Sequence, residues 1–273
     1  MHLACVPVLW LAPSWPAIAV CLALYWLRMF GITGGFHRYF SHRSYKTSRL
    51  FQFGLAWLGT SAAQLGPLWW ASHHRKHHAH SDTEKDVHPP GLRGFVWAHL
   101  GWIFAPENKT TDLSKVKDLA RYPELVWLDR YPLVPPFLLA LAVLWLGVGL
   151  ERVAPDLGVS GAQMLVWGFF VSTVVLYHAT FCINSLAHLV GSRRYDTHDD
   201  SRNSLFLALL TMGEGWHNNH HQYPSSERQG FYWWEIDLTH YLLVGLARLG
   251  LVWDLRQPPA SAFSDSGPAR GSA

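Results

Sequence analysis

The stretch Ser72-His73-His74-Arg75-Lys76-His77-His78 places four histidines within six positions of this 273-residue chain. If the stretch is helical, His74, His77 and His78 stand at i, i+3 and i+4, so three imidazoles share one helix face. Such a face is poorly suited to an apolar core, and neutral imidazoles are common metal ligands. The stretch therefore predicts a metal-binding surface rather than a run of solvated basic residues.

Two further histidine clusters support this interpretation. His217-Asn218-Asn219-His220-His221 repeats the i, i+3, i+4 spacing, and His37-Arg38-Tyr39-Phe40-Ser41-His42 is a looser pair. An α-helix turns about 500° over five residues, so we expect His37 and His42 to lie on different faces, at a helix end and in the loop after it. These eight histidines exceed the four ligands of one tetrahedral zinc ion, and two metal ions are the simplest interpretation.

The composition is typical of an all-α integral membrane protein. The chain is 49% hydrophobic and 15% charged, against about 25% charged in an ordinary soluble domain. Its 15 tryptophans and 14 phenylalanines suit membrane–water interfaces. A net charge of +3 gives no reason to expect nucleic acid as a partner. Cys5, Cys21 and Cys182 have no paired spacing, so no disulfide framework is expected.

We expect a single domain over residues 1–255 with about four transmembrane helices, followed by a disordered Pro/Ser/Gly/Ala tail at 256–273. The first helix is shortened, because twelve apolar residues reach only about half of a roughly 30 Å hydrocarbon core. A short helix is expected at 112–121. The expected spans are about 1–12 (partial), 15–34, 133–150 and 164–187.

The three histidine clusters can meet only if they lie on the same side of the membrane. Two expected spans separate His78 from His217, which satisfies this condition. One apolar stretch, 50–71, separates His42 from His73 and carries polar side chains, so we expect an interfacial helix rather than a crossing. The opposite loop offers only Arg152. The excess of Lys and Arg on the histidine side predicts a cytoplasmic location, and these residues are Arg38, Arg43, Lys46, Arg49, Arg75, Lys76, Arg193 and Arg194.

The choice of metal is not decided by the ligands alone. A nearly all-imidazole site suits iron, copper or zinc about equally, and only Glu214-x-x-His217 matches the motif of soluble di-iron carboxylate proteins. Zinc has no redox chemistry, whereas a polyhistidine dimetal site at a membrane suggests oxygen activation against a lipid C–H bond. We therefore expect iron. Asn184 and His188, at i and i+4, add a ninth imidazole and an amide on one helix face.

Together these motifs resemble the signature of membrane fatty-acyl desaturases, most closely the stearoyl-CoA (acyl-CoA delta-9) type and its bacterial relatives, from about Gly31 to Leu255. The resemblance implies a four-span helical protein whose cytoplasmic helical cap holds two irons. It also implies the use of O2 and two electrons to place a cis double bond, commonly at the ninth carbon, in a saturated acyl chain. Asn184 would hold a metal-bound water. The implied ligands are His37, His42, His74, His77, His78, His188, His217, His220 and His221.

The resemblance leaves the acyl carrier and the electron donor open. Ser72 and His73 stand where animal relatives carry an arginine and an acidic residue, so the carrier is CoA, a carrier protein or a membrane lipid. No dinucleotide-binding fingerprint or haem motif is present, and a separate ferredoxin or small haem cytochrome, with its reductase, is expected on the basic face. The bacterial relatives imply an inner-membrane location.

Two residues are candidates for contact with the substrate. Tyr25 lies three turns before His37 on about the same helix face, where its ring would shorten an acyl tunnel, although a packing contact is an equally good interpretation. Trp70 is the second candidate, with lipid contact as its alternative. Asp82 and Asp86 either orient ligand imidazoles or belong to a solvated turn. The histidines expected to be structural, or to lie behind the ligands, are His80, His88, His99, His178, His198 and His240.

Two other functions share some of these features. A membrane hydroxylase acting on lipid would use the same metals and differ in its product. A metal transporter or sensor would need polar groups near the middle of the membrane, and 133–150 has none. The motifs at Asn184–His188 and Gly213–His221 favour desaturation.

Overall fold

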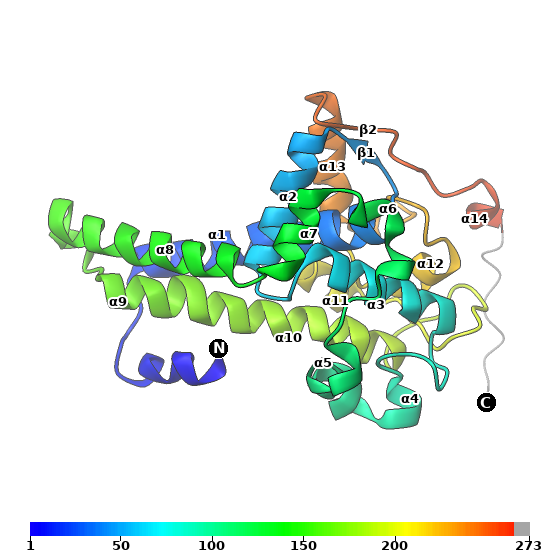
Figure 1. Ribbon diagram of the computed structural model, residues 1–273, viewed down its shortest axis with the longest axis horizontal. Coiled ribbons are helices and arrows are strands. Elements are labelled where there is room, and N and C mark those ends of the chain that lie inside the picture. The colour runs from blue at the N-terminus through cyan, green and yellow to red at the C-terminus, as the bar shows by residue number, and fades with distance from the viewer. Residues whose placement is uncertain (265–273) are drawn as a thin grey trace.

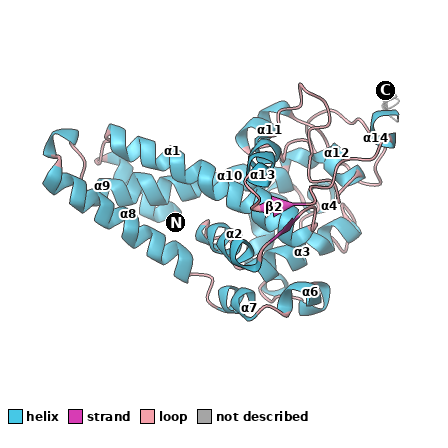
Figure 2. Ribbon diagram, turned by 90° about the horizontal axis from the view of Figure 1, so that it is seen from above, coloured by secondary structure: helices cyan, strands magenta, loops and turns pink. Residues whose placement is uncertain are grey.

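The computed structural model describes residues 1–264, which are mostly helical (Figure 1). Within these residues three helices are long and apolar enough to cross a membrane. They run side by side along the long axis of the molecule, and most of the other elements gather at one end (Figures 1 and 2). The predicted fold class, an all-α membrane protein with a helical cap, is therefore confirmed. The three helices are Trp15–Ser41, Val134–Val153 and Gly161–His188.

The first expected span, about 1–12, is not an α-helix like the three long spans. It contains the 3-10 helix η1 (His2–Leu9), which packs against the π-helix η7 (Met164–Val171). A 3-10 helix rises about 2.0 Å per residue, so these eight residues extend over roughly half of a hydrocarbon core. Three of the four expected spans are thus present at full length, and the fourth is the short segment that its length predicted.

The winding of the first long helix explains why His37 and His42 come together. It begins as α1 (Trp15–Phe30) and continues without a break as the π-helix η2 (Gly31–Ser41). The His42 N–H bonds to the His37 carbonyl at 3.2 Å, an i→i+5 hydrogen bond. This wider turn places both imidazoles on one side, with ring centroids 4.8 Å apart. The expectation of different faces is wrong because it assumed α-helical winding; π-turns are rare and frequently mark functional sites.

The apolar stretch 50–71 is not a single interfacial helix. It forms α2 (Arg49–Ser61), a reversal, and the first turns of α3 (Pro67–His80). Ala63 and Leu65 adopt left-handed φ angles of 57° and 65° in the reversal, a conformation that is uncommon outside glycine. Single-sequence periodicity does not reveal such a turn, since the residues on both sides of it are equally apolar.

The start of α3 is held by a side chain from elsewhere in the cap. Asp129 of α7 (Pro123–Arg130) accepts a hydrogen bond from the Trp69 N–H at 2.8 Å, which satisfies one of the free donors of the first helical turn. A Cβ atom on Gly66 would lie 2.4 Å from the Asp129 Cα, so only glycine allows this approach. The direction of the histidine-bearing helix is therefore set by α7.

Helix α2 packs closely against the first long helix. A Cβ atom on Gly31 would lie 2.8 Å from the Gly59 nitrogen, and one on Gly59 would lie 2.4 Å from the Phe36 ring. Small residues permit this approach of helix backbones in membrane proteins. The main apolar core surrounds this contact and includes Phe36 and Leu55.

The other elements complete the spans and the cap. The two short strands pair antiparallel, with Lys46 opposite Trp253. The predicted helix at 112–121 is two short turns, η5 and α6, separated at Val116. The elements not yet named are β1 (Lys46–Thr47), α4 (Pro90–Arg93), η3 (Trp97–Gly101), α5 (Trp102–Phe104), η4 (Pro106–Asn108), η5 (Leu113–Lys115), α6 (Lys117–Ala120), α8 (Val134–Val153), η6 (Pro155–Leu157), α9 (Gly161–Gln163), α10 (Ser172–Asn184), η8 (Leu186–His188), α11 (Leu205–Leu210), α12 (His217–Gln222), α13 (Leu238–Arg248), β2 (Val252–Trp253) and α14 (Ser261–Ser264).

Part of the tail that the composition predicts to be disordered is folded onto the cap. The Arg256 N–H bonds to the Ser44 carbonyl at 2.9 Å, and the Tyr195 hydroxyl donates to the Ala262 carbonyl at 2.6 Å. These contacts order residues 256–264, which no periodicity in the sequence indicates. The remainder of the predicted tail, 265–273, lies outside the described residues.

The close contact between α2 and the first helix predicts a difference between two glycines of α2. Gly59→Ala overpacks the contact at Phe36 and should destabilise the protein by about 1–3 kcal/mol. Gly54→Ala is the control, because nothing lies within 4 Å of its added Cβ and alanine is the better helix former by up to about 1 kcal/mol. Thermal unfolding of the purified protein should show a lower midpoint for Gly59→Ala alone; equal midpoints would contradict this packing.

Candidate metal centre

Nine histidines form two adjacent clusters where the spans meet the cap. Within each cluster, one nitrogen from every histidine lies within 4.8 Å of the others. These nine are the histidines that the sequence predicts as ligands. The five-histidine cluster contains His37, His42, His74, His78 and His220, and the four-histidine cluster contains His77, His188, His217 and His221.

Helices α3 and α12 each serve both clusters. On α3, His74 and His78 face the five-histidine cluster, while His77 belongs to the other. On α12, His220 belongs to the five-histidine cluster, while His217 and His221 belong to the other. The i, i+3, i+4 spacing predicts the faces correctly, but each triplet is divided between two sites. The two helices therefore form a common wall between the clusters.

The Nε2 atoms converge at distances that suit coordination of a metal ion. With a metal–nitrogen distance of about 2.1 Å, adjacent ligands lie about 3.0 Å apart in an octahedron and about 3.4 Å apart in a tetrahedron. The observed Nε2–Nε2 distances are 2.8 Å for His42–His74, 3.0 Å for His37–His220, His78–His220 and His188–His217, and 3.4 Å for His77–His221.

Carboxylates behind the imidazoles determine which nitrogen faces inward. The Nδ1 atoms of His77 and His188 lie 3.0 Å from Asp86 and 2.8 Å from Asp82. A histidine that donates its Nδ1–H to a carboxylate presents the Nε2 lone pair on its other side. In His77 and His221 both Nδ1 atoms face carboxylates, so their Nε2 lone pairs lie 3.4 Å apart and repel one another, and a cation between them would remove the repulsion. The donor set therefore fits a metal ion in each cluster.

Two of the supporting carboxylates were not identified in the sequence. The His221 Nδ1 lies 2.5 Å from Asp199, and the His37 Nδ1 pairs with Glu214. Asp199 comes from a charged loop whose sequence gives no sign of this role. Glu214 was noted only for its spacing from His217, and the contact with His37 depends on the tertiary fold. Asp82 and Asp86, in contrast, lie where one of the two interpretations of the sequence placed them.

Burial and mutual crowding keep most cluster imidazoles neutral. Burial, and then the neighbouring histidines, lower the pKa of His74 and of His220 well below the usual value. Burial also lowers the pKa of His221 to about 4, although Asp199 acts in the opposite direction. Burial tends to raise the pKa of Asp86, but the adjacent His77 outweighs this and the pKa lies well below its usual range. Neutral imidazoles backed by ionised carboxylates are the state that metal binding requires.

A buried ion network supports Glu214. The Arg38 side chain is 1% exposed and contacts Glu214 at 3.0 Å and Asp237 at 2.9 Å. It also donates to the Glu227 carbonyl at 2.8 Å. Arg38 was counted among the basic residues facing the cytoplasm; the structure instead buries it, where it fixes the carboxylate behind His37. Removing one partner of such a network would leave an uncompensated buried charge.

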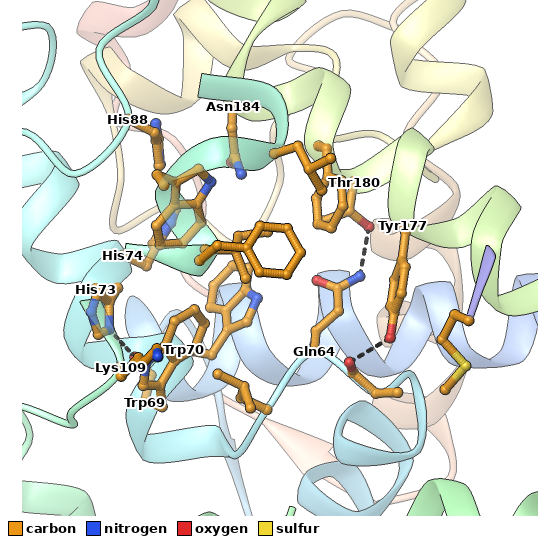
Figure 3. A pocket seen from close by; sticks show the side chains of 18 of the residues that line it. Gln64, Trp69, Trp70, His73, His74, His88, Lys109, Tyr177, Thr180 and Asn184 are labelled. Atoms are coloured by element: carbon orange, nitrogen blue, oxygen red, sulfur yellow. Dashed lines mark hydrogen bonds between the residues drawn. The ribbon is translucent and has the colours of Figure 1, made fainter. Parts of the chain in front are cut away.

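A cavity of about 500 Å³ leads from the surface to the five-histidine cluster. Figure 3 shows Gln64 and Thr180 on one side of it, His74 on the other, and Asn184 directed into it. The Gln64 amide donates to the Thr180 hydroxyl at 3.2 Å, and Trp70 stacks on His74 with centroids 4.9 Å apart.

A smaller cavity of about 30 Å³ continues toward both clusters. It shares Trp70, His74, Thr180 and Asn184 with the larger cavity. It is also lined by Met29 and by histidines of both clusters. The two cavities therefore form one path that ends between the two clusters.

The structure separates the two predicted substrate contacts. Trp70 lines both cavities, whereas Tyr25 lines neither. The Tyr25 hydroxyl donates to the Leu210 carbonyl at 2.6 Å, which is the packing contact named as its alternative. Met29, one turn later, lines the smaller cavity instead.

The six histidines expected to be structural lie outside both clusters. His88 is buried, and its ring lies 4.3 Å from that of His77. His99 and His178 lie 3.0 Å apart, within hydrogen-bonding distance. His240 pairs with Glu227 at 2.8 Å.

Comparisons with known proteins agree with this geometry. Residues 13–254 match the family model described as "Fatty acid desaturase". The chain is 40% identical over 245 residues to an sn-1 stearoyl-lipid 9-desaturase of Anabaena variabilis, covering 89% of this chain and 85% of the relative. It is 38% identical to an sn-2 palmitoyl-lipid 9-desaturase of Nostoc sp. (strain 36), covering 91% and 85%. It is 37% identical to an acyl-CoA C20 Delta5-desaturase of Anemone leveillei, covering 90% and 75%.

The carboxylate behind His221 can be tested by metal retention. Asp199→Asn removes the charge that orients this imidazole, and outer partners of metal ligands typically contribute about 10–100-fold in affinity. Asp196→Asn is the control, because it lies in the same loop with a fully exposed side chain. Purified protein challenged with a chelator should lose metal faster only in Asp199→Asn. Equal loss from both variants would show that Asp199 does not support the site.

Proposed function

This chain belongs to the fatty acid desaturase family, and from that premise we propose that it introduces a cis double bond at the ninth carbon of a saturated acyl chain carried by a membrane lipid. In the balanced reaction a –CH2–CH2– unit, O2, two electrons and two protons give –CH=CH– and two waters. The observation that carries the proposal is the convergence of the nine imidazoles at the end of an apolar cavity.

We further propose that the bound metals are two irons, one in each cluster. Iron supplies the one-electron redox chemistry needed to activate O2, which zinc lacks. The five-histidine cluster offers five ligands and the four-histidine cluster offers four. Asn184 lines both cavities, and its amide would hold a water at the four-histidine site, completing that ligand set. A lipid hydroxylase with the same metals is the second candidate, and its product distinguishes it.

The cavity walls explain how this chain would select one carbon pair. Leu100, Trp102 and Phe181 give an apolar lining for an acyl chain. The Gln64–Thr180 hydrogen bond and the Trp70 ring narrow the path beside His74, where the larger cavity meets the smaller one. The distance from the carrier end of the cavity to this constriction would determine which carbons lie next to the metals.

The names of the relatives support a double bond at the ninth carbon and a lipid carrier, but the relatives also differ in both properties. Two cyanobacterial relatives are named as stearoyl-lipid and palmitoyl-lipid 9-desaturases. A plant relative of similar identity is named as an acyl-CoA Delta5-desaturase. Position and carrier thus vary among relatives at the same distance, and acyl-CoA is the alternative carrier.

The electrons would come from a separate ferredoxin or small haem cytochrome, delivered by its reductase. A surface depression of about 380 Å³ on the cap is lined by Arg43, Lys46, Arg121 and Arg256. Arg43 directly follows His42 of the five-histidine cluster, so an acidic donor bound here would lie close to that site. We place this face in the cytoplasm of a bacterium, with the spans in its inner membrane and residues 1–255 acting as one domain.

Lipid analysis of a host expressing the chain tests the proposed reaction. Wild type should contain about two irons per chain and yield cis-9 monounsaturated acyl groups, first in the membrane lipids. His217→Ala leaves the four-histidine cluster with three imidazoles, so product and about half of the iron should be lost. His80→Ala is the control on α3, outside both clusters.

Gas chromatography with mass spectrometry, together with metal analysis, reads out both effects. A hydroxylated product would favour the hydroxylase. Iron-loaded protein that forms no product from any acyl carrier would contradict the proposal.

The smaller cavity predicts which residue controls chain length. Met29→Ala enlarges the cavity beside the metals and should raise the ratio of eighteen-carbon to sixteen-carbon products severalfold. Tyr25→Phe removes only the hydroxyl that bonds to Leu210 and should leave the ratio unchanged, because Tyr25 lines neither cavity. A ratio that responds to Tyr25→Phe and not to Met29→Ala would contradict this assignment.

A further inference from the structure

The segment of residues 90–104 is apolar and exposed although it lies outside the three spans. It consists of α4, η3 and α5 and is called here the 90–104 segment. Exposed apolar residues gathered in one short segment indicate contact with a membrane or a partner rather than with water. The exposed side chains are Leu92 (58%), Phe95 (43%), Val96 (74%) and Phe104 (69%).

Contacts with a span place this segment at the depth of the membrane. The His99 ring lies within hydrogen-bonding distance of His178, at 3.0 Å, and of the Ser185 hydroxyl, also at 3.0 Å. His178 precedes the end of its span at His188 by ten residues, which is about 15 Å along a helix. The segment therefore packs against the cap-side half of a membrane span, beside α10 in Figure 1.

The segment also carries the residue types that lie at membrane–water interfaces. The Arg93 guanidinium lies over the Trp97 ring at 3.6 Å from its centroid. A cation stacked on an indole can keep its charge in the headgroup region while the ring lies at the edge of the hydrocarbon. This pairing suits a helix that lies in the interface rather than across the membrane.

The same segment forms a wall of the larger cavity. Leu100, Trp102, Ile103 and Phe104 all line it. Phe104 is both 69% exposed and part of the lining, so it lies where the cavity is open to the surface. Lys109, which is exposed, lines the same cavity (Figure 3).

We propose that the 90–104 segment lies in the membrane interface and forms a side entrance, through which the acyl chain of an intact bilayer glycerolipid reaches the cavity. Lys109 would face the phosphate of the lipid headgroup at the cavity mouth. The proposal rests on the proposed desaturase function and specifies its substrate class as acyl-lipid. CoA also carries phosphates that Lys109 could meet, so the experiment compares the two carriers.

Photo-crosslinking distinguishes the two routes. Wild-type protein is reconstituted in vesicles containing phosphatidylglycerol whose acyl chain carries a diazirine, and in a second arm it receives diazirine-stearoyl-CoA in solution. After illumination, mass spectrometry should locate lipid adducts on cavity residues such as Leu100 and Trp102. Lipid adducts confined to exposed span residues such as Phe137 and Trp145, or cavity adducts from the CoA probe alone, would overturn the proposal.

Paired variants test the segment itself. Leu92→Asp/Val96→Asp introduces charges that oppose insertion into the interface and should reduce lipid adducts in the cavity severalfold. The control, Val153→Asp/Leu157→Asp, changes residues that are 80% and 45% exposed, at the end of α8 and in the following η6, and should leave those adducts unchanged. Adducts on Phe137 and Trp145 report that each variant is correctly inserted. Cavity labelling that is unchanged in the first variant would show that the segment is not the entrance.

The readout separates this proposal from the proposed function. If wild type forms the double bond but its cavity is not labelled by the lipid probe, the desaturase function stands and the entrance fails. If the cavity is labelled but iron-loaded protein in the same vesicles, supplied with O2 and with reduced ferredoxin or small haem cytochrome as electron donor, forms no product, the entrance stands and the desaturase function fails.

Discussion

The mutual repulsion of imidazole lone pairs is the constraint on which the rest of the cap depends. Five of the nine cluster histidines are 2–3% exposed, and their Nε2 atoms lie about 3 Å from one another. A buried polar group is costly unless it is partnered, and here the inward nitrogens have little besides one another. The arrangement is stabilised by carboxylates that anchor the Nδ1 atoms of His37, His77, His188 and His221 from behind, and by a cation that would balance the Nε2 atoms. Both effects explain features of the fold far from the clusters.

The carboxylates that anchor the imidazoles come from loops, and these contacts explain the conformations of the loops. Asp82 adopts a left-handed φ of 58° and accepts hydrogen bonds from His188 and from the Asp200 N–H, both at 2.8 Å. The loop after α3 and the loop before α11 are thereby joined across the four-histidine cluster. Glu214 is held in turn by Arg38, which bonds to Asp237 and to the Glu227 carbonyl. The carboxylates that support the two clusters thus join segments that lie more than a hundred residues apart in the sequence.

The sequence predicts which histidines gather because spacing along a helix determines which side chains share a face. The i, i+3, i+4 histidines needed only this geometry, and the apolar runs needed only length. Asn184 and His188 do not share one helix face as expected, because α10 ends at Asn184 and His188 lies in η8. The features that the sequence did not predict depend on local winding of the chain or on distant partners. The π-helix η2 reverses the expected separation of His37 and His42. Left-handed residues break the apolar stretch 50–71 into two helices.

Dependence on winding or on distant partners also explains the other residues whose positions or roles the sequence did not predict. Tyr25 was assigned from its distance to His37 along the helix, but its hydroxyl bonds to the distant Leu210 carbonyl, and Met29 lines the smaller cavity. Asp199 acts on His221 from a loop that is ordered by pairing of Ser192 with Asn203 and of Asn203 with Trp216, and no short-range pattern encodes that contact. Residues 256–264 fold because Tyr195 and Ser44 supply partners from the cap.

The division of each histidine triplet between two clusters has a chemical consequence. Because α3 and α12 both contribute to both clusters, a shift of either helix would move ligands of both sites, whereas loss of one side chain would remove a ligand from one site alone. The smaller cavity ends against this common wall, where it touches His37 and His74 of one cluster and His77 and His217 of the other. Both sites therefore face the same end of the path, beside Met29 and Asn184. Desaturation and hydroxylation both begin with removal of one hydrogen and differ in the step that follows, so this shared wall would fix where a substrate carbon stands, and only the product distinguishes the two reactions.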